Sequence, residues 1–539
     1  MVSMSLVLLQ LLLIFSGGSL VSGFCPKGCS CNDQQLVVEC TNTTLDVLPI
    51  ALNTRILHLK MNLNKINIVD ASFQFYEHLE TIDLCRNLIS RIEDKSFAAQ
   101  KNLKVLLLDQ NRLIRLNNQA FTGLWALEEL SLRNNLVNAL PTGLLDELTS
   151  LKILDLSHNN IQTIPSQVFR LCSNLLSLNL GFNKFDSVPS DAFENTRKLE
   201  MLDLSSNQLK LIQDGSFNFI STLISLNLAN TSLSSLDKDS LSNLVLLKNL
   251  NLSENKLDSI PTNQLRNQRK LNIIDLSNNM FKVLSPHAFR QLEALQVVNI
   301  SHCPGLLQIQ AASFHNNLDL HVVDLSNNPR LSDIQPHAFP QILHIQTLLL
   351  SYTGLTSLHE DAIPWNRLIK LDLSGTRMVC SCQLAWLTSS GDVTGGVCSQ
   401  PSRLAGTNLS QITTADLGCG YQYSEEVIVV AIVCAVVLVL ALGGAVTCCL
   451  LGKKMRNLGR MRNLAPSCTL AAREQDLKSS YDNCLYVEKN YGLVGSERPG
   501  LIYSGMKTVQ APEKEEFKNL RVGSLDKLLN SDTLVSNNQ

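Results

Sequence analysis

Cysteine is the residue type whose number and spacing in this sequence could do chemistry. The chain has 16 cysteines in 539 residues, and two groups of four stand on either side of a long leucine-rich stretch. These groups are Cys25, Cys29, Cys31 and Cys40, and Cys380, Cys382, Cys398 and Cys419. Clustered cysteines form either disulfides or zinc sites; no histidine stands at ligand spacing here, so disulfides are favoured in an exported chain. Spacing alone leaves three connectivities for each group.

The other polar residues give no sign of catalysis. The sequence has no clustered nucleophile, base and oxyanion set, no glycine-rich phosphate loop and no metal constellation, so we expect neither an enzyme nor a cofactor. The net charge is −2, which provides no whole-chain attraction to nucleic acid. Hydrophobic residues make up 45% of the chain and aromatic residues 5%, an aliphatic content that excludes a disordered chain.

An apolar run near the N-terminus predicts export. Leu6–Phe15 is too short to cross a bilayer, which needs about 20 residues, and small residues up to Gly23 fit a signal-peptidase site. We therefore assign residues 1–23 to a signal peptide cleaved after Gly23. A buried N-terminal helix is the alternative interpretation.

A second apolar run, Val427–Leu451, carries no charge over 25 residues and is long enough to cross a bilayer as a helix. Glu425 and Glu426 precede it, and basic residues from Lys453 onward follow it, so the positive-inside rule places the N-terminus outside the cell. We expect a single-pass type I protein of the plasma membrane, with a linker at 421–426, a transmembrane helix at 427–451 and a cytoplasmic tail at 452–539. A buried core helix is the alternative.

Between the cysteine groups, one pattern recurs with a period of 24 residues: L-x-x-L-x-L-x-x-N. Its asparagines stand at Asn87, Asn111, Asn135, Asn159, Asn183 and Asn207. The series continues at the same spacing through Thr231, Asn255, Asn279 and Cys303, and it then loosens to Asn328, Thr353 and Thr376. This is the pattern of the leucine-rich repeat. The leucines are expected to point inward from short strands, while the asparagines bond the backbone where each strand turns. Phenylalanines about ten residues past the motif predict a second buried row: Phe97, Phe121, Phe169, Phe193, Phe217 and Phe289.

The sequence therefore predicts an α/β solenoid, a curved horseshoe of about fourteen repeats over residues 53–376, with stacking that is obligatory because one repeat cannot bury its own apolar face. A leucine-rich helical bundle is the competing fold. The open ends of a solenoid need caps, and we assign residues 24–52 and 377–420 to small disulfide caps.

Both caps resemble the cysteine-rich flanks of extracellular leucine-rich-repeat proteins of the Slit, Toll-ectodomain and neuronal types. C-S-C-Q-L-A-W-L at Cys380–Leu387 carries the strongest match, and the resemblance covers residues 25–419. It implies first-with-third and second-with-fourth pairing in each cap, and a receptor or adhesion role. The implied pairs are Cys25–Cys31, Cys29–Cys40, Cys380–Cys398 and Cys382–Cys419.

The remaining cysteines have separate interpretations. Cys172 replaces a core leucine and is expected to be a buried free thiol. Cys85 is placed on the exposed strand face, and Cys303 in the asparagine row. Cys448 and Cys449 lie at the cytoplasmic membrane edge, which suits lipidation, although two small residues filling a helix end explain them equally well.

The variable positions of the early repeats are the predicted ligand-binding surface. They carry mixed charges, which suit a protein partner and argue against nucleic acid. The candidate residues are Glu80, Arg86, Asp109, Glu128, Glu129, Arg133 and His158. Any single residue has a competing interpretation as a solvated or structural one, as for the recurring aspartates Asp155 and Asp203.

Five glycosylation sequons stand on the expected extracellular side, at Asn42, Asn230, Asn251, Asn299 and Asn408. Three of them, Asn230, Asn251 and Asn299, are expected on the concave strand face, where glycans would screen the middle of the solenoid. Chance matches are also expected, because N-L-S is a product of the repeat pattern.

The tail has 14 Lys and Arg against 10 Asp and Glu, a net charge of +4, and shows no helical or strand period. We expect it to be disordered. Tyr481 and Tyr503 resemble sites for SH2 domains, and Tyr491 and Tyr503 resemble endocytic signals; such short patterns also arise by chance.

These observations predict a cell-surface protein that binds an extracellular or cell-surface protein and recruits SH2 or endocytic adaptors inside. A structural adhesion protein with an anchoring tail is the alternative. A third interpretation is an innate-immune receptor without its own signalling domain.

Overall fold

The computed structural model describes residues 24–340, 344–389, 392–419 and 425–456. It divides into two units, one ending at Ile428 and the other beginning at Val429, and each is described by itself. The signal peptide at 1–23, most of the 421–426 linker and the tail tyrosines Tyr481, Tyr491 and Tyr503 lie outside the described residues, and their assignments remain predictions.

The first unit is built on one sheet of 17 short strands. From β2 to β25 neighbouring strands are parallel and lie in chain order, and only β1 is antiparallel, to β2. The strands of this main sheet are β1 (Ser30–Asn32), β2 (Val37–Glu39), β3 (His58–Lys60), β5 (Thr81–Asp83), β7 (Val105–Leu107), β8 (Glu129–Ser131), β9 (Ile153–Asp155), β10 (Ser177–Asn179), β11 (Met201–Asp203), β13 (Ser225–Asn227), β15 (Asn249–Asn251), β16 (Ile273–Asp275), β18 (Val297–Asn299), β20 (Val322–Asp324), β22 (Thr347–Leu349), β23 (Lys370–Asp372) and β25 (Asp392–Thr394).

The leucine period sets the register of this sheet. Leu106 pairs with Leu130 and Leu130 with Leu154, so each strand advances by one 24-residue repeat. The middle residue of the strand is buried because side chains alternate across a strand, and the leucine that follows the strand is buried beside it, as Leu106 and Leu108 show. Each such leucine contributes about 1.5–3 kcal/mol by its burial.

The asparagine row is a hydrogen-bond ladder. Asn111 donates from Nδ2 to the carbonyls of Leu84 and Leu108, both at 3.0 Å, and its Oδ1 accepts from the backbone N–H of Ile89 at 3.0 Å. Asn159 makes the same three contacts further along the sheet: its Nδ2 donates to the carbonyls of Leu132 and Leu156, and its Oδ1 accepts from the backbone N–H of Val137. Thr231 keeps one of these bonds, to the Leu228 carbonyl at 2.8 Å, so it replaces asparagine in part.

The predicted phenylalanines are buried, and rings stack at the C-terminal end of the row. The six predicted rings are at most 1% exposed, and the row extends to Phe73, Phe314 and Phe339. Ring centroids lie 5.2 Å apart between Phe289 and Phe314 and 4.4 Å apart between Phe314 and Phe339. These ring contacts join neighbouring repeats to one another.

Short strands and 3₁₀ turns complete each repeat. The lateral strands are β4 (Ile68–Val69), β6 (Arg91–Ile92), β12 (Leu211–Ile212), β14 (Ser235–Leu236), β17 (Val283–Leu284), β19 (Gln308–Ile309), β21 (Asp333–Ile334), β24 (Arg377–Val379) and β26 (Val397–Gln400). The 3₁₀ turns are η1 (Ala71–Phe75), η2 (Ser190–Phe193), η3 (Glu360–Ala362), η4 (Trp365–Arg367), η5 (Cys382–Ser389), η6 (Ser402–Leu404) and η7 (Leu409–Gln411).

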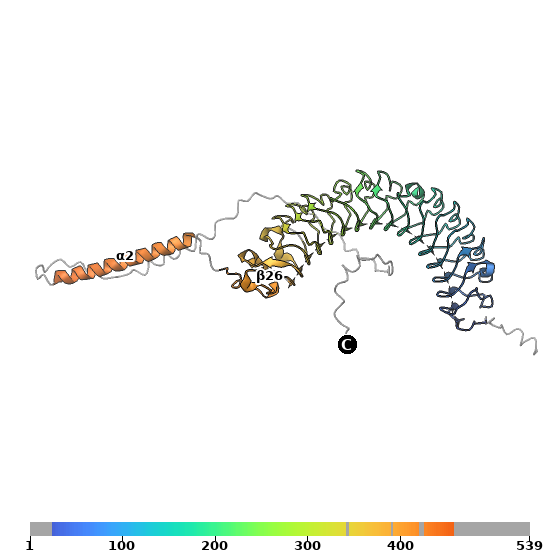
Figure 1. Ribbon diagram of the computed structural model, residues 1–539, viewed down its shortest axis with the longest axis horizontal. Coiled ribbons are helices and arrows are strands. Elements are labelled where there is room, and N and C mark those ends of the chain that lie inside the picture. The colour runs from blue at the N-terminus through green and yellow to red at the C-terminus, as the bar shows by residue number, and fades with distance from the viewer. Residues whose placement is uncertain (1–23, 341–343, 390–391, 420–424, 457–539) are drawn as a thin grey trace, which may run out of the picture. The chain divides into compact units, whose positions relative to one another are not determined.

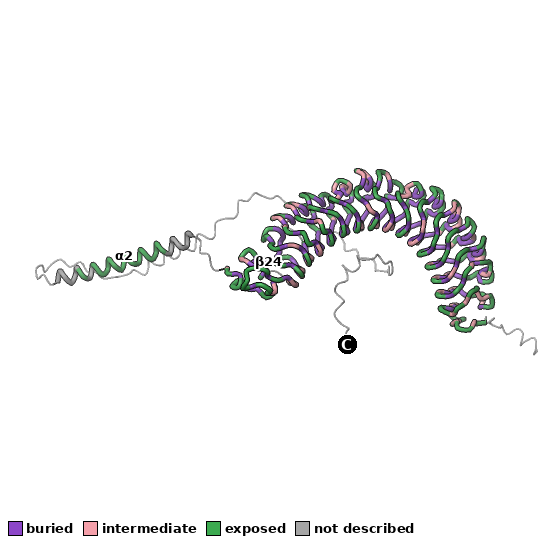
Figure 2. Tube along the Cα trace, viewed as in Figure 1, coloured by how far each residue is buried: buried purple, intermediate pink, exposed green. Residues whose placement is uncertain are grey.

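The repeats form an arch, with buried residues recurring along every turn (Figures 1 and 2). Strands of a sheet stand about 4.8 Å apart, whereas turns and stacked rings on the opposite side need more room per repeat. The stack therefore curves with the main sheet on its inner side. This is the concave face, formed by the outward side chains of the strands and by the residues of the turns that follow them.

Disulfides close both ends of the solenoid. The pairs are Cys25–Cys31, Cys29–Cys40, Cys380–Cys398 and Cys382–Cys419, which are the pairs that the resemblance implies. The N-terminal group supplies β1 and β2, and the C-terminal group follows β23 and includes β26. Cys40 and Cys398 are themselves buried in the core, so these bridges join both ends of the solenoid to the leucine stack.

The second unit contains most of one helix, α2 (Glu425–Arg456), which covers the apolar run Val427–Leu451. The side chains described in it are those of residues 432–447 and 450. Within the residues that the structure describes, no helix combines the length and the hydropathy needed to cross a membrane, so the transmembrane helix at 427–451 stays a prediction from the sequence.

Candidate functional site

The turn that follows each main-sheet strand holds its residues in a strained conformation. Three places after the strand, each repeat has a residue in the left-handed region, with φ of 55° at Arg86 and 54° at His158, Phe182 and Tyr352. Asparagine and glycine tolerate this region best, so bulky side chains there are held against a local preference. Arg86 is exposed at this position.

Two of the predicted residues lie in ion pairs just before their strands. Glu80 contacts Lys104 at 2.9 Å, and Glu128 contacts Lys152 at 2.8 Å, each across one repeat. Glu80 and Lys104 also line a recess of 560 Å³ at the edge of the sheet. These pairs face solvent, so each contributes about 0–1 kcal/mol to stability and leaves its charges available to a partner.

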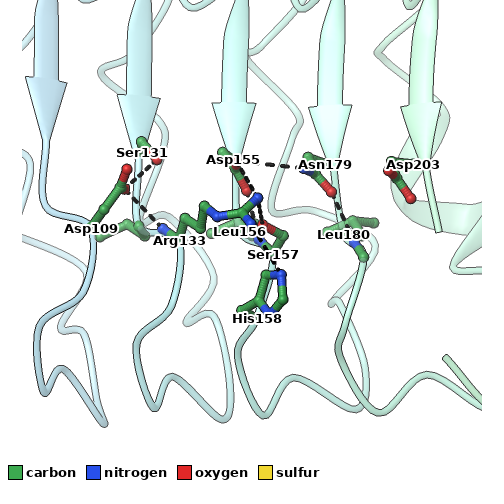
Figure 3. A network of polar contacts seen from close by, with 12 residues as sticks. Asp109, Ser131, Arg133, Asp155, Leu156, Ser157, His158, Asn179, Leu180 and Asp203 are labelled. Carbon is green, nitrogen blue, oxygen red and sulfur yellow. Dashed lines mark hydrogen bonds and ion pairs between the residues drawn. The ribbon is translucent and has the colours of Figure 1, made fainter. Parts of the chain in front are cut away.

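Asp109 and Arg133 are brought together in adjacent turns (Figure 3). Asp109 accepts a short hydrogen bond from the Ser131 hydroxyl and a second from the backbone N–H of Arg133 at 3.1 Å. Burial raises the pKa of Asp109, and the charge of Asp155 adds to the effect. Burial likewise raises the pKa of Glu129, with contributions from Asp109 and Asp155. Carboxylates therefore crowd this part of the face.

Arg133 continues the network toward the next repeats. Its guanidinium lies 3.3 Å from Ser157 Oγ, 3.2 Å from His158 Nε2 and 4.0 Å from an Asp155 oxygen. The His158 ring stacks on Phe182, with centroids 4.0 Å apart and planes 11° apart. Burial lowers the pKa of His158, as does the charge of Arg133, so the imidazole is neutral at pH 7 and accepts from the guanidinium.

Beyond Asp155 the strand ends carry alternating carboxylates and amides. Asn179 Nδ2 lies 3.5 Å from Asp155, and Asn227 Nδ2 donates to Asp203 at 2.9 Å. Each of these side chains also accepts from the backbone N–H two residues on, as Asp203 does from Ser205 at 2.7 Å. The aspartates thus have the structural role that the sequence suggested, while their charge remains on the concave face.

The structure therefore unites Asp109, Glu129, Arg133 and His158 in one surface, which Figure 3 shows in part. Glu80 and Glu128 lie toward the edge at the amino ends of the strands. Sequence reasoning missed Phe182 and the amide of Asn179 as members of this surface. Their spacing could have shown them, because Phe182 stands one repeat after His158 and Asn179 one repeat after Asp155.

The sequons differ in accessibility, which corrects one expectation. Asn230 does not lie on a strand: it is exposed in the turn after β13, with φ of 54°. Asn251 ends β15 and is half-buried, whereas Asn299 ends β18 and is only 8% exposed, its Oδ1 accepting from the Ser301 N–H at 3.0 Å. Asn42 is exposed and Asn408 is half-buried. Of the three sequons Asn230, Asn251 and Asn299, the geometry therefore supports a glycan at Asn230 and does not support one at Asn299.

The unpaired cysteines of the solenoid are thiols rather than reactive thiolates. Burial raises the pKa of Cys172 to about 12 and that of Cys303 to about 11. Cys85 is half-buried in the turn after β5 rather than on the exposed strand face, and burial raises its pKa too. Cys448 and Cys449 fall within α2, but their side chains lie outside the described residues, so their lipidation stays a prediction.

Metal binding finds no support in the part of the chain that the structure describes. No group of three or more His, Cys, Asp or Glu side chains there could hold an ion. The concave face presents charges, hydrogen-bonding groups and exposed aromatic rings such as those of Phe182 and Tyr352.

Comparison with known proteins matches this architecture. A family model described as "Leucine rich repeat" matches residues 77–137, 126–185 and 149–209, and one described as "BspA type Leucine rich repeat region (6 copies)" matches residues 186–321 and 282–376. Together these matches run from residue 77 to residue 376, which is more than half of the chain.

Solved structures share the fold at low sequence identity. A leucine-rich-repeat protein of Leptospira interrogans is 22% identical, with a TM-score of 0.51 over 65% of this chain and 81% of that chain. A chain of the glycosylated Toll–Spatzle complex of Drosophila is 21% identical, with a TM-score of 0.53 over 69% of this chain. The match spans 59% of that second chain's length.

Proposed function

Because the chain belongs to the leucine-rich repeat family, we propose that it is a cell-surface protein that binds another protein through the N-terminal half of its concave face. We place the solenoid outside the cell, the apolar run of α2 in the plasma membrane and the tail inside. The fold offers a rigid, preformed surface, which supports binding.

The observation that carries the proposal is the uncompensated charge of the concave face between β7 and β11. Asp109, Asp155 and Asp203 lie there with Arg133 as the cation among them, and His158 is neutral. Glu129 is the first residue of β8 and adds a further carboxylate. Such crowding disfavours the free protein, as the raised pKa of Asp109 and of Glu129 indicates. A partner of complementary charge would relieve it, and electrostatic complementarity mainly provides specificity and fast association.

The relatives add support for a protein partner. One of the similar chains was solved in a complex of Toll with Spatzle, which is an assembly of proteins. The disulfides support an extracellular solenoid, because disulfides persist in oxidising compartments. The sequence supports coupling through the tail, by Tyr481, Tyr491 and Tyr503.

The test uses the full-length chain expressed on living cells. A screen with a library of extracellular proteins should capture a partner, and competition with an antibody against the turns after β7 to β11 should abolish the capture. A partner that binds equally well with those turns covered would contradict the concave-face assignment.

A tail truncation after Arg462 separates receptor from adhesion protein. If the tail recruits adaptors, truncation abolishes the cellular response while partner capture stays intact. A response that survives truncation would favour the anchoring role instead.

A further inference from the structure

Gly181 allows three oxygen atoms to converge beside the Arg133–His158–Phe182 network. An ideal Cβ at Gly181 would lie 3.0 Å from Ser205 Oγ and 3.2 Å from both Asn179 Oδ1 and Asp203 Oδ1. The two neighbouring repeats carry a side chain at this place, Ser157 and Ser205. Gly181 does not have a positive φ, so its backbone conformation does not require a glycine. Its missing side chain instead permits the close approach of these oxygens.

The carboxylate of Asp203 has capacity for further donors. Among the described residues it accepts from the Ser205 N–H at 2.7 Å and from Asn227 Nδ2 at 2.9 Å. An ionised carboxylate offers about four lone-pair sites, so about two remain for a ligand. Asp203 is half-buried, and its outer edge is therefore within reach of solvent.

Phe182 adds an exposed aromatic ring in the same turn. It directly follows Gly181, is 50% exposed and has φ of 54°. One ring face is covered by the His158 imidazole, so the exposed area belongs to the opposite face and the ring edge. An exposed phenylalanine in the left-handed region is doubly unfavourable in the free protein, which points to a role in binding.

A second cation is disfavoured on the face of Phe182 that the His158 imidazole covers. The Arg133 guanidinium contacts His158 Nε2 at 3.2 Å, so this side of the stack already carries a positive charge. A second cation is therefore directed to the open face of Phe182. His158 follows β9 and Phe182 follows β10, so the open face is turned toward the next repeat, in which Asp203 ends β11.

We propose that Phe182, Asp203 and Asn179 form a subsite for an arginine side chain of the protein partner. The guanidinium stacks on the open face of Phe182 and donates to the oxygens of Asp203 and Asn179. A planar guanidinium suits this arrangement better than a point charge does, because it stacks and donates along its edge at the same time. The subsite rests on the proposed function, since it names the chemistry that the concave face recognises.

The chain offers matched variants for a test. Phe182→Asn removes the ring and keeps a residue that tolerates the left-handed turn, as Asn134 and Asn278 do at the same place in other repeats. Asp203→Asn removes the charge. Gly181→Ala adds a methyl group within 3.0–3.2 Å of the three oxygens, which must then shift, and it changes no charge. Tyr352→Asn is the control: Tyr352 is 62% exposed with φ of 54° at the same place in a distant repeat, where its ring lies against Gly375.

The probe is N-acetyl-arginine methylamide, compared with its citrulline analogue, which has the same shape without the charge, and with its lysine analogue. Saturation-transfer NMR on the full-length chain in detergent micelles measures binding of each probe. We expect the strongest signal on the arginine side chain, a loss of about two- to fivefold in Phe182→Asn, as one exposed cation–π contact supplies, and weaker binding in Asp203→Asn and Gly181→Ala. Tyr352→Asn should bind arginine as the wild type does.

Equal arginine and citrulline signals, or an unchanged arginine signal in the folded Phe182→Asn and Asp203→Asn proteins, would overturn the subsite. A lysine signal equal to that of arginine would overturn its assignment to a guanidinium. Melting curves identify variants that fail to fold. If Phe182→Asn or Asp203→Asn does not fold, Gly181→Ala tests the subsite without a change of charge. Failure of the proposed function is a separate result: a partner that binds away from the concave face leaves the arginine signal unchanged.

Discussion

The guanidinium of Arg133 lies 3.2 Å from Nε2 of His158, the residue 25 places further along the chain and one repeat away on the sheet. Arginine can only donate, so this contact requires a neutral imidazole with a free Nε2 lone pair. The His158 ring in turn stacks on Phe182. Three turns are thus linked by side chains that the repeat pattern itself leaves free to vary.

This contact predicts a pH dependence. Burial and Arg133 lower the pKa of His158 in the folded protein, so the unfolded chain takes up its proton first as the pH falls. The stabilisation by neutral His158 is present above the ordinary pKa of about 6.5 and is lost as the pH falls through the lower folded pKa. We expect the melting temperature to fall less in His158→Gln than in the wild type between pH 7 and pH 5. Parallel melting curves for the two proteins over this range would contradict the link.

Glu129 predicts a pH dependence of stability with the opposite sign to that of His158. Burial and the charges of Asp109 and Asp155 raise its pKa in the folded state, so its ionised form destabilises the fold at pH 7. Glu129→Gln should therefore raise the melting temperature at pH 7, and the difference from the wild type should shrink as the pH falls and Glu129 takes up its proton. Glu128→Gln is the control, because Glu128 pairs with Lys152 at 2.8 Å and its loss should not stabilise the protein.

The asparagine ladder predicts a strong contrast between neighbours. Asn159 satisfies the carbonyls of Leu132 and Leu156 and the N–H of Val137, so Asn159→Ala should lower the free energy of unfolding by about 1–3 kcal/mol. Asn160 stands one place further along, outside the ladder, and Asn160→Ala should be nearly silent. Denaturant titration measures both, and equal shifts in the two variants would refute the ladder's role.

Glycan occupancy should follow exposure. Asn42 and Asn230 are exposed, whereas Asn299 is 8% exposed and bonded to its own sequon serine. Mass spectrometry of the chain secreted or displayed by cells should find glycans at Asn42 and Asn230 and a bare Asn299. A folded protein with a glycan on most copies of Asn299 would show that the strand end opens more than this geometry allows.

The sequence predicts the parts of this molecule that the period constrains. Leucine, asparagine and phenylalanine recur because stacking buries one set of positions in every repeat, so the core, the ladder and the order of the strands follow from their spacing. Positions that face solvent carry no such constraint, and the sequence could not show that Phe182 stacks on His158 or that Gly181 brings Asn179 and Asp203 together. The misplacement of Asn230 has a similar cause: the motif does not mark where a three-residue strand ends and its left-handed turn begins.

The central claim is that a protein partner binds the N-terminal half of the concave face, and paired charge reversals on the displayed full-length chain test it most directly. Glu128→Lys with Glu129→Lys alters the acidic surface next to Arg133, whereas Lys248→Glu with Glu254→Lys alters exposed residues around β15 and conserves the net charge. Measured as the amount of captured partner per displayed molecule, the first pair should weaken capture at least about tenfold, the scale of a buried interfacial charge, and the second pair should leave it unchanged. A greater loss of partner capture in the second pair than in the first, at equal surface display, would contradict the account.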